Sequence, residues 1–213
     1  EDSFNFGYVL TTTDLYKLTP CENSKIIGGK FDQAQDVTNA ISAIGGQYAV
    51  DCEVTGIHGL NLRENLTKIW YSTGIIGDKH RCENAQVTGA GEGYGSQLLV
   101  CRHSIIGKGI YKNVRHGVDF SGGSDLICWK NNSSYVDSAV GSAAYTMGHG
   151  LRSRRIKCID NYSLNFPVGV VAGNPAFEVD HYVDTINNTI VGATATAAIF
   201  YTSGGTERAT GGF

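Results

Sequence analysis

The sequence has few of the features that mark helical, membrane-spanning or nucleic-acid-binding proteins. Apolar residues rarely recur at i, i+3, i+4 and i+7 over three turns, so amphipathic helices are not predicted for most of the chain. The chain has no apolar run of roughly 18 residues, and it opens on the acidic stretch EDSFNFGYVL, so we expect no membrane insertion. A formal net charge of −3 argues against a nucleic-acid partner, because binding phosphates requires a basic face.

Several motifs that carry chemistry are also missing. No CxxC or HxxxH pair occurs, so a metal site is not expected. The glycine-rich run GAGEGYGS lacks the GxxxxGK[ST] pattern of a phosphate-binding loop, and no GxSxG nucleophile motif occurs. We therefore expect no metal and no cofactor.

What remains is the pattern of an all-β protein. Short runs of Val, Ile, Tyr and Thr recur along the 213 residues and are broken by Gly, Asn, Asp or Ser. With 28 glycines, 3 prolines and 41% hydrophobic residues, the chain is too apolar for disorder and long enough for one core. Two architectures fit this density of strands, a β-solenoid and an antiparallel sandwich.

An internal repeat over residues 115–163 favours the solenoid. An offset of 30 residues places Cys128 on Cys158 (158 − 128 = 30). The same offset superposes Asn131 with Asn161 and Ser133 with Ser163, and Asn187 follows a further 26 residues on. Stacked coils require such columns of equivalent residues and a sandwich does not, so the sequence predicts one parallel β-helix domain over 1–213.

Within this domain, residues 1–47 are expected to form entry strands. Residues 32–47 are the best helix candidate, with another coil as the alternative, and residues 48–213 are expected to form regular coils. The lack of an obvious polar cap at either end leads us to expect a fragment of a longer chain. The six cysteines are expected to form one inward-pointing ladder of reduced thiols rather than disulfides, with one cysteine per coil: Cys21, Cys52, Cys82, Cys101, Cys128 and Cys158.

Two phrases within the repeat, RHGVDFS at 115–121 and YTMGHG at 145–150, carry a resemblance. They resemble the right-handed parallel β-helix of the pectate-lyase-like superfamily, and specifically its versions in bacteriophage tailspikes and appendage proteins. The second phrase matches loosely, with Met147 and Gly148 inserted before His149. The resemblance implies a homotrimer on the virion tail that binds a bacterial surface polysaccharide and in many members cleaves it.

Candidate catalytic residues form two groups. Asp119 and His116 lie in the first phrase, with His149 expected nearby, because a histidine beside a carboxylate is suited to proton transfer. Alternatively, Asp119 is an ordinary outward polar residue and His116 caps a turn. Glu178 and Asp180 would lie on one face of a strand at a spacing that suits paired carboxylates, unless they are solvated edge charges.

Candidate substrate-binding residues are basic or aromatic. Arg152, Arg154 and Arg155 would bind the carboxylate of an acidic sugar, or else face acids of a neighbouring protomer. Trp129 and Tyr145 would supply flat rings, although strands and trimer interfaces also favour such residues.

Three functions remain open from the sequence. The first is a virion-borne depolymerase, either hydrolase or lyase. The second is a non-catalytic receptor-binding or structural segment of a spike. The third is a secreted pectate-lyase-like enzyme with an extracellular location.

Overall fold

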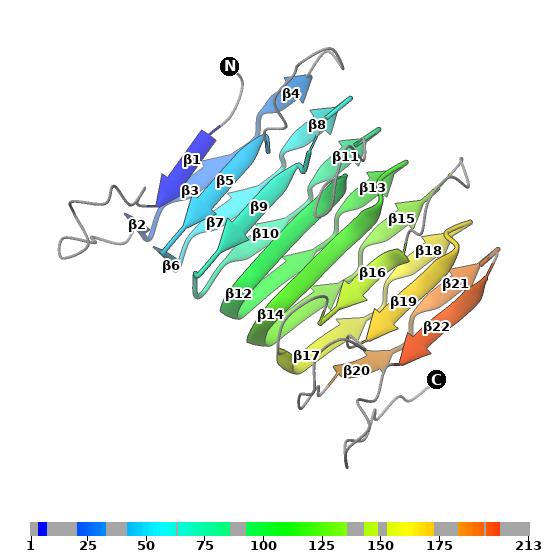
Figure 1. Ribbon diagram of the computed structural model, residues 1–213. Coiled ribbons are helices and arrows are strands. Elements are labelled where there is room, and N and C mark those ends of the chain that lie inside the picture. The colour runs from blue at the N-terminus through cyan, green and yellow to red at the C-terminus, as the bar shows by residue number, and fades with distance from the viewer. Residues whose placement is uncertain are drawn as a thin grey trace.

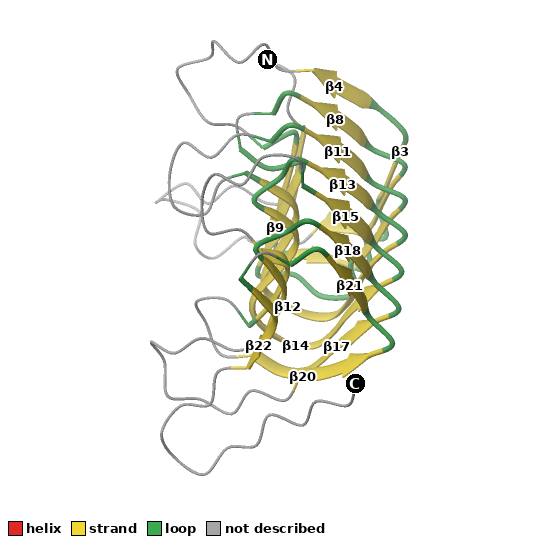
Figure 2. Ribbon diagram, turned by 90° about the vertical axis from the view of Figure 1, so that its right-hand side faces the viewer, coloured by secondary structure: helices red, strands yellow, loops and turns green. Residues whose placement is uncertain are grey.

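The molecule is a stack of parallel strands (Figures 1 and 2). The computed structural model describes residues 4–7, 21–32, 42–62, 64–85, 93–135, 143–148, 153–172, 183–193 and 195–200, with the backbone alone for 4–7, 172 and 196–200. Among these residues every paired strand is parallel to its neighbour and no helix occurs. The predicted parallel β-solenoid is confirmed, and the antiparallel sandwich is excluded.

The solenoid has three faces, two of which belong to one 13-stranded sheet. Face 1 contains β1 (Phe4–Gly7), β5 (Ile44–Gln47), β9 (Thr67–Trp70), β12 (Tyr94–Gly107), β14 (His116–Trp129), β16 (Ala143–Met147), β19 (Val168–Ala172) and β22 (Thr196–Phe200). Face 2 contains β3 (Lys25–Ile27), β7 (Glu53–Thr55), β10 (Ile76–Asp78), the second halves of β12 and β14, β17 (Ser153–Ile159) and β20 (Val183–Ile186).

Face 3 is a seven-stranded ladder of short strands, clearly visible in Figure 2. It contains β4 (Lys30–Asp32), β8 (His58–Leu60), β11 (Arg81–Glu83), β13 (Ile110–Lys112), β15 (Asn132–Ser134), β18 (Tyr162–Leu164) and β21 (Thr189–Val191). A short sheet of β2 (Cys21–Glu22) and β6 (Ala49–Val50) lies at the bend between faces 1 and 2, and it continues through bridges from Val50 to Thr73 and from Thr73 to Arg102.

The chain turns between faces at residues in the left-handed conformation, which glycine and asparagine adopt at the lowest cost. The corner between faces 2 and 3 is formed by Gly28, Gly56, Lys79, Lys108, Lys130, Asp160 and Asn187. The corner after face 3 is formed by Asn61, Asn84, Asn113, Asn165 and Gly192. There the amides also bond along the stack: Asn84 Nδ2 donates to Asn61 Oδ1 at 3.3 Å and Asn113 Nδ2 to Asn84 Oδ1 at 3.1 Å.

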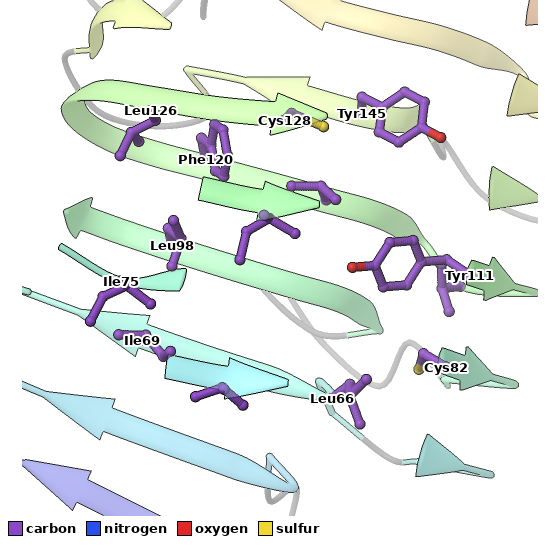
Figure 3. Close-up of a cluster of buried hydrophobic side chains, with 14 of the residues drawn as sticks. Leu66, Ile69, Ile75, Cys82, Leu98, Tyr111, Phe120, Leu126, Cys128 and Tyr145 are labelled. Carbon is purple, nitrogen blue, oxygen red and sulfur yellow. The ribbon is translucent and has the colours of Figure 1, made fainter. Parts of the chain in front are cut away.

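The interior is a continuous apolar core between the three faces (Figure 3). Leu98 and Phe120 enter it from face 1, Leu126 from face 2 and Tyr111 from face 3, and all four are fully buried. Because successive residues of a strand point to opposite sides, Asp119 must point outward between the core residues Val118 and Phe120.

The predicted column of asparagines is also confirmed, with one correction, and the structure places Asn131 and Asn161 inside the solenoid. Asn131 Nδ2 donates to Asn161 Oδ1 at 3.1 Å, and Asn161 Nδ2 donates to Asn188 Oδ1 at 3.0 Å. The third member is therefore Asn188. Asn187, which the sequence offset selected, is the left-handed corner residue immediately before it.

The cysteines are free, as predicted, and only Cys21 is partly exposed. They do not form a single ladder, however. Cys128 pairs in register with Cys158, whereas Cys82 lies level with Tyr111 in face 3 and Cys101 level with Gly123 near the bend. The prediction was wrong because a buried thiol behaves as a small apolar group that suits any inward position.

The start of the regular coils was also misplaced. Residues 44–47, predicted as the end of a helix, form β5, which pairs in register with β9. Residues 33–41 of the predicted helix lie outside the described part of the chain. Ile44 is fully buried in the core, which its apolar side chain permits equally well in a strand or a helix.

Candidate functional site

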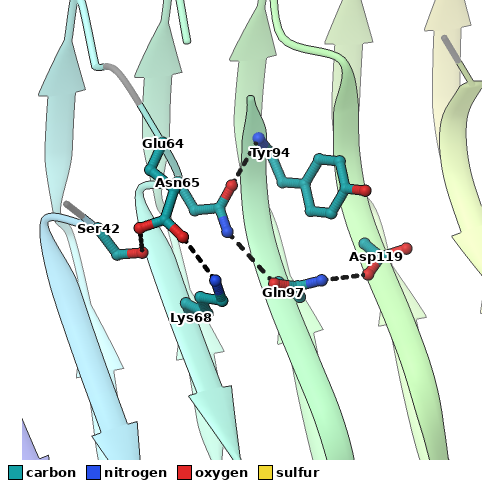
Figure 4. Close-up of polar contacts among 7 residues, drawn as sticks. All are labelled: Ser42, Glu64, Asn65, Lys68, Tyr94, Gln97 and Asp119. Atoms are coloured by element: carbon teal, nitrogen blue, oxygen red, sulfur yellow. Dashed lines mark hydrogen bonds and ion pairs between the residues drawn. The ribbon is translucent and has the colours of Figure 1, made fainter. Parts of the chain in front are cut away.

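A row of polar side chains lies on the outward-pointing side of face 1 (Figure 4). Most of its members are nevertheless buried. The strand register places Lys68 beside Gln97, Gln97 beside Asp119, and Asp119 beside Thr146. Each of these residues comes from a different coil, so the row exists only because the coils stack in register. Thr146 lies one coil beyond Asp119.

Side-chain amides in this row are oriented by a chain of hydrogen bonds. Asn65 Oδ1 accepts from the backbone N–H of Tyr94 at 2.9 Å, and Asn65 Nδ2 donates to Gln97 Oε1 at 3.2 Å. Gln97 Nε2 in turn donates to Asp119 Oδ2 at 2.8 Å. Because each amide accepts on its oxygen and donates from its nitrogen, all N–H donors point toward the Asp119 carboxyl group.

Asp119 is the end point of this network. Ser121 Oγ donates to Asp119 Oδ2 at 2.7 Å, and Thr146 Oγ1 donates to Oδ1. Its side chain is 0% exposed. A carboxyl group that accepts from Gln97, Ser121 and Thr146 is held in one orientation, an arrangement suited to organising the polar face. Its catalytic role stays a prediction.

His116 is also buried, at 4% exposure. Its Nδ1 lies 2.9 Å from the carbonyl oxygen of Ala143, and its ring packs against Tyr94 with 4.7 Å between centroids. The Arg115 guanidinium lies 5.7 Å from the centroid of the same Tyr94 ring. The structure thus places His116 and Asp119 in β14, each with its own set of contacts.

A second carboxylate on face 1 lies at its edge. Glu64 accepts from Ser42 Oγ at 2.7 Å and from Lys68 Nζ at 2.5 Å. Its side chain is 12% exposed, so the ion pair is largely shielded. Sequence analysis did not select Glu64, because its partners Ser42 and Lys68 meet it only in the folded chain.

Tyr145, predicted to bind substrate, is instead a core residue with 1% exposure. Its hydroxyl lies 2.8 Å from the carbonyl oxygen of Asn131 and 2.6 Å from that of Tyr162. The phrase AAYTM places Tyr145 inward and Thr146 outward, so the ring cannot contact a ligand on the outer surface. Four other candidates, His149, Arg152, Glu178 and Asp180, lie outside the described residues.

A separate groove of about 410 Å³ lies on the outer surface of face 2. Its lining consists of Asp125, Ile127, Arg155, Lys157 and Asp184. Register places Lys157 between Ile127 and Asp184, one residue from each of β14, β17 and β20. This groove contains Arg155 of the predicted substrate-binding run.

The charges of the groove are arranged around one bidentate ion pair. Arg155 Nε and Nη2 donate to the two carboxylate oxygens of Asp125 at 2.5 and 2.7 Å. These hydrogen bonds lower the pKa of Asp125 to about 2. His103 Nδ1 lies 3.6 Å from the same carboxylate. Asp125 therefore remains ionised over the ordinary pH range and holds Arg155 at the groove wall.

Two other predicted binding residues lie at the same side of the molecule, Arg154 exposed and Trp129 half-buried. Arg154 lies level with Ser124, and it directly precedes the groove residue Arg155 in the sequence. Trp129 lies two residues beyond Ile127 in β14, and the Nζ atoms of Lys108 and Lys130 lie 5.1 and 4.7 Å from its ring centroid. A sugar stacking on Trp129 would have to compete with these lysines.

Asp125 was not among the residues predicted from the sequence, although a signal for it was present. The offset of 30 residues that superposes the cysteines also places Asp125 on Arg155 (155 − 125 = 30). Opposite charges one coil apart at an exposed corner are expected to pair.

In the described part of the chain, no cluster of three His, Cys, Asp or Glu residues is arranged to hold a metal ion. The described residues likewise contain no helix long and apolar enough to cross a membrane.

The fold and the outward polar surfaces define a parallel β-solenoid with grooves along its faces, and known structures share this architecture. Two structures of the Streptococcus pneumoniae surface adhesin PfbA superpose with TM-scores of 0.61 and 0.63, at 13% and 12% sequence identity. They cover 92% and 91% of this chain, and the chain spans about half of theirs, 54% and 50%. This similarity shows the fold alone.

Other comparisons add less. The catalytic unit of a GH87 α-1,3-glucanase from Streptomyces thermodiastaticus superposes with a TM-score of 0.28 at 11% sequence identity. The match covers 88% of this chain and 50% of the glucanase unit, and a similarity this low supports no conclusion. No family model matches the sequence. No curated protein matches it significantly.

Proposed function

We propose that this chain binds an acidic bacterial surface polysaccharide through the groove on face 2, as part of a tailspike-like or adhesin-like surface protein. The observation that supports this proposal is the groove of about 410 Å³ that combines Arg155 and Lys157 with Asp125, Asp184 and Ile127. A volume of this size lies within the range of small-molecule sites.

The chemistry of the groove favours an acidic sugar over a neutral one. A guanidinium has five N–H donors, and Arg155 spends two of them on Asp125. The remaining donors and the exposed Lys157 ammonium are suited to a ligand carboxylate. Asp125 and Asp184 are suited to accept from sugar hydroxyls, and Ile127 offers apolar surface to the C–H groups of a sugar ring.

The homotrimer that the tailspike resemblance implies is supported by the apolar surface of face 2. Ile76 and Ile186 are 47% and 42% exposed, and Ile27 is 71% exposed. Half-buried Ile105, Ile127, Trp129 and Ile159 lie between them. Assembly through part of this surface would place the groove near a protomer boundary on a virion or another extracellular spike.

Cleavage of the polysaccharide, by hydrolysis or by elimination, is the further step that the resemblance implies. It requires carboxylates or a histidine that converge on the bound sugar. Because Asp119 and His116 are buried, Glu178 and Asp180 are the first residues to mutate in a test of hydrolysis, followed by His149 in a test of elimination.

The test is incubation of the chain with a panel of capsule and O-antigen polysaccharides. Binding, new reducing ends and the absorbance of unsaturated uronates are recorded together. Reducing ends without the absorbance would indicate a hydrolase, and both signals together a lyase. Binding with neither signal would leave an adhesin, and no binding to any acidic polysaccharide would contradict the proposal.

Variants then locate the site. Arg155→Gln removes charge-assisted hydrogen bonds worth about 1.5–3 kcal/mol, so we expect binding to weaken about 10-fold to 100-fold. Arg81→Gln is the matched control, because Arg81 forms a similar exposed ion pair with Glu83 on face 3. Equal affinities for these two variants would place the ligand elsewhere.

A further inference from the structure

A second groove lies where face 1 bends into the short sheet. It has a volume of about 410 Å³ and is lined by Tyr48, Ala49, Val50, Tyr71, Ser72, Thr73, Val100 and Arg102. Register on the short sheet places Val50, Thr73 and Arg102 side by side on consecutive coils. Ala49 and Ser72 are buried beneath them, so this row faces outward.

The wall of this groove is a ridge of large side chains at one corner of the solenoid. Tyr48 and Tyr71 stack one coil apart, with 5.7 Å between ring centroids and 15° between planes. Val100 continues the column, because it follows Leu99, which pairs with the residue before Tyr71. Tyr71 is 51% and Val100 37% exposed, so these side chains contribute little to the core.

The backbone at this corner is left-handed, as it is at the corners on either side of face 3, but here aromatic or β-branched residues adopt this conformation where those corners have Gly, Asn, Asp or Lys. Tyr48, Tyr71 and Val100 have φ of 53°, 55° and 54°, in the left-handed region. At equivalent corners after face 3 the chain uses Asn or Gly, which adopt this conformation readily. Aromatic and β-branched residues there lower stability, so the ridge is not explained by folding, and strain of this kind is typical of binding sites.

Arg102 gives the groove its charge. It is exposed, and within the described residues no ion pair involves it. A guanidinium in the same groove as an aromatic ridge, with Thr73 level with Arg102, suits a ligand with an apolar ring face, hydroxyl groups and a carboxylate. We propose that this groove is a second binding site for an acidic sugar, with the carboxylate on Arg102 and the ring against Tyr48 and Tyr71.

The two grooves lie on adjacent surfaces of the same chain. His103, next to Arg102, lies 3.6 Å from the carboxylate of Asp125, which lines the groove on face 2. A polysaccharide that occupies both grooves would bind with higher avidity than either site alone provides. This inference rests on the proposed function for the class of ligand but concerns a different site.

Calorimetric titration with a short oligogalacturonate tests the second site. The expected result is two sites per chain, with no binding of the carboxyl-reduced oligosaccharide. Arg102→Gln and Tyr71→Asn should each remove one site or weaken it at least tenfold, and Arg155→Gln should affect only the other. Arg81→Gln should retain both. Because asparagine accepts the left-handed conformation, Tyr71→Asn should unfold at the same temperature as the parent chain or higher.

The outcomes separate the two proposals. A single site that responds to Arg155→Gln, but not to Arg102→Gln or Tyr71→Asn, overturns the second groove and retains the first. A single site with the opposite response overturns the groove on face 2 and supports this one. No binding of oligogalacturonate overturns the second groove, and the panel of bacterial polysaccharides then decides the first. Should Tyr71→Asn fold poorly, the argument from strain is wrong and Arg102→Gln still tests the site.

Discussion

His80 is a histidine enclosed by the solenoid core. Its Nε2 lies 2.9 Å from the carbonyl oxygen of Val54 and its Nδ1 lies 2.9 Å from Ser96 Oγ, which lies 2.9 Å from the Tyr111 hydroxyl. A neutral ring protonated on Nε2 satisfies every contact, donating to Val54 and accepting from Ser96. Burial lowers the pKa of His80 to about 4, which keeps the ring neutral near neutral pH.

This residue makes stability depend on pH. Between pH 6.5 and about 4 the unfolded chain binds a proton that the folded chain does not, so stability falls as the pH decreases through this window. We expect His80 to lower the free energy of unfolding by about 3 kcal/mol. This loss is complete below the pKa of His80 in the folded chain and absent above pH 6.5. Denaturant unfolding across this range measures it.

Two variants separate His80 from other groups. His80→Gln should flatten the pH dependence even if the variant is less stable overall. His103→Gln, at a side chain 68% exposed, should leave most of it unchanged. If the unfolding free energy of His80→Gln depends on pH as steeply as that of the parent chain, the His80 ring is protonated inside the fold.

At the scale of the strand, glycines in β12 set how closely side chains fill the interior. A Cβ on Gly95 would lie 2.2 Å from Tyr111 Cδ1 and 2.5 Å from the carbonyl oxygen of Gly117. A Cβ on Gly107 in the same strand would meet its neighbours only at 3.4 Å. The missing side chain of Gly95 makes room for the Tyr111 ring, whereas a methyl group at Gly107 would fit among its neighbours.

Gly95→Ala should therefore destabilise the chain strongly. Because one clash is with backbone, the strand must shift, and overpacking of this kind costs about 1–3 kcal/mol. Gly107→Ala is the matched control and should change stability by less than about 0.5 kcal/mol. Chemical denaturation of both variants checks the difference, and similar midpoints would contradict the packing described for Tyr111.

The strand pattern shows which elements the sequence could predict. The 30-residue offset identified the stack of β14 on β17, because Cys128, Asn131 and Ser133 each lie level with their equivalents. The cysteine ladder failed because the coils differ in length and an inward thiol needs only a small apolar position. Residues 44–47 were assigned to a helix because Ile44 is apolar and buried in either structure.

The site was predicted less completely than the fold. Arg155 was selected from a basic run, but Asp125 and Asp184 come from neighbouring coils and carry no local motif. Burial of Asp119 depends on Gln97 and Thr146, which meet it only through register. The ridge of Tyr48 and Tyr71 could not be predicted, because nothing in the local sequence shows that both residues adopt a left-handed conformation at one corner.

At the scale of the whole molecule, stability is distributed along a one-dimensional stack. Each coil contacts only its neighbours, so strands at the ends of a sheet have one partner and central strands have two. On face 3, β4 and β21 are the terminal strands, whereas β11 and β13 are central. β12 and β14 pair with each other along nearly their whole length and are covered by further strands on both sides.

Hydrogen exchange of the 213-residue chain should follow this order. Backbone amides of β12 and β14 should exchange most slowly. Those of β4 and β21 should exchange fastest among the strands of face 3, because opening a terminal strand breaks one ladder of hydrogen bonds and exposes less apolar surface. Gly95→Ala should accelerate exchange in the centre more than at the ends. Uniform protection in all strands would instead show that the solenoid unfolds as one cooperative unit, and the nearest-neighbour description would be wrong.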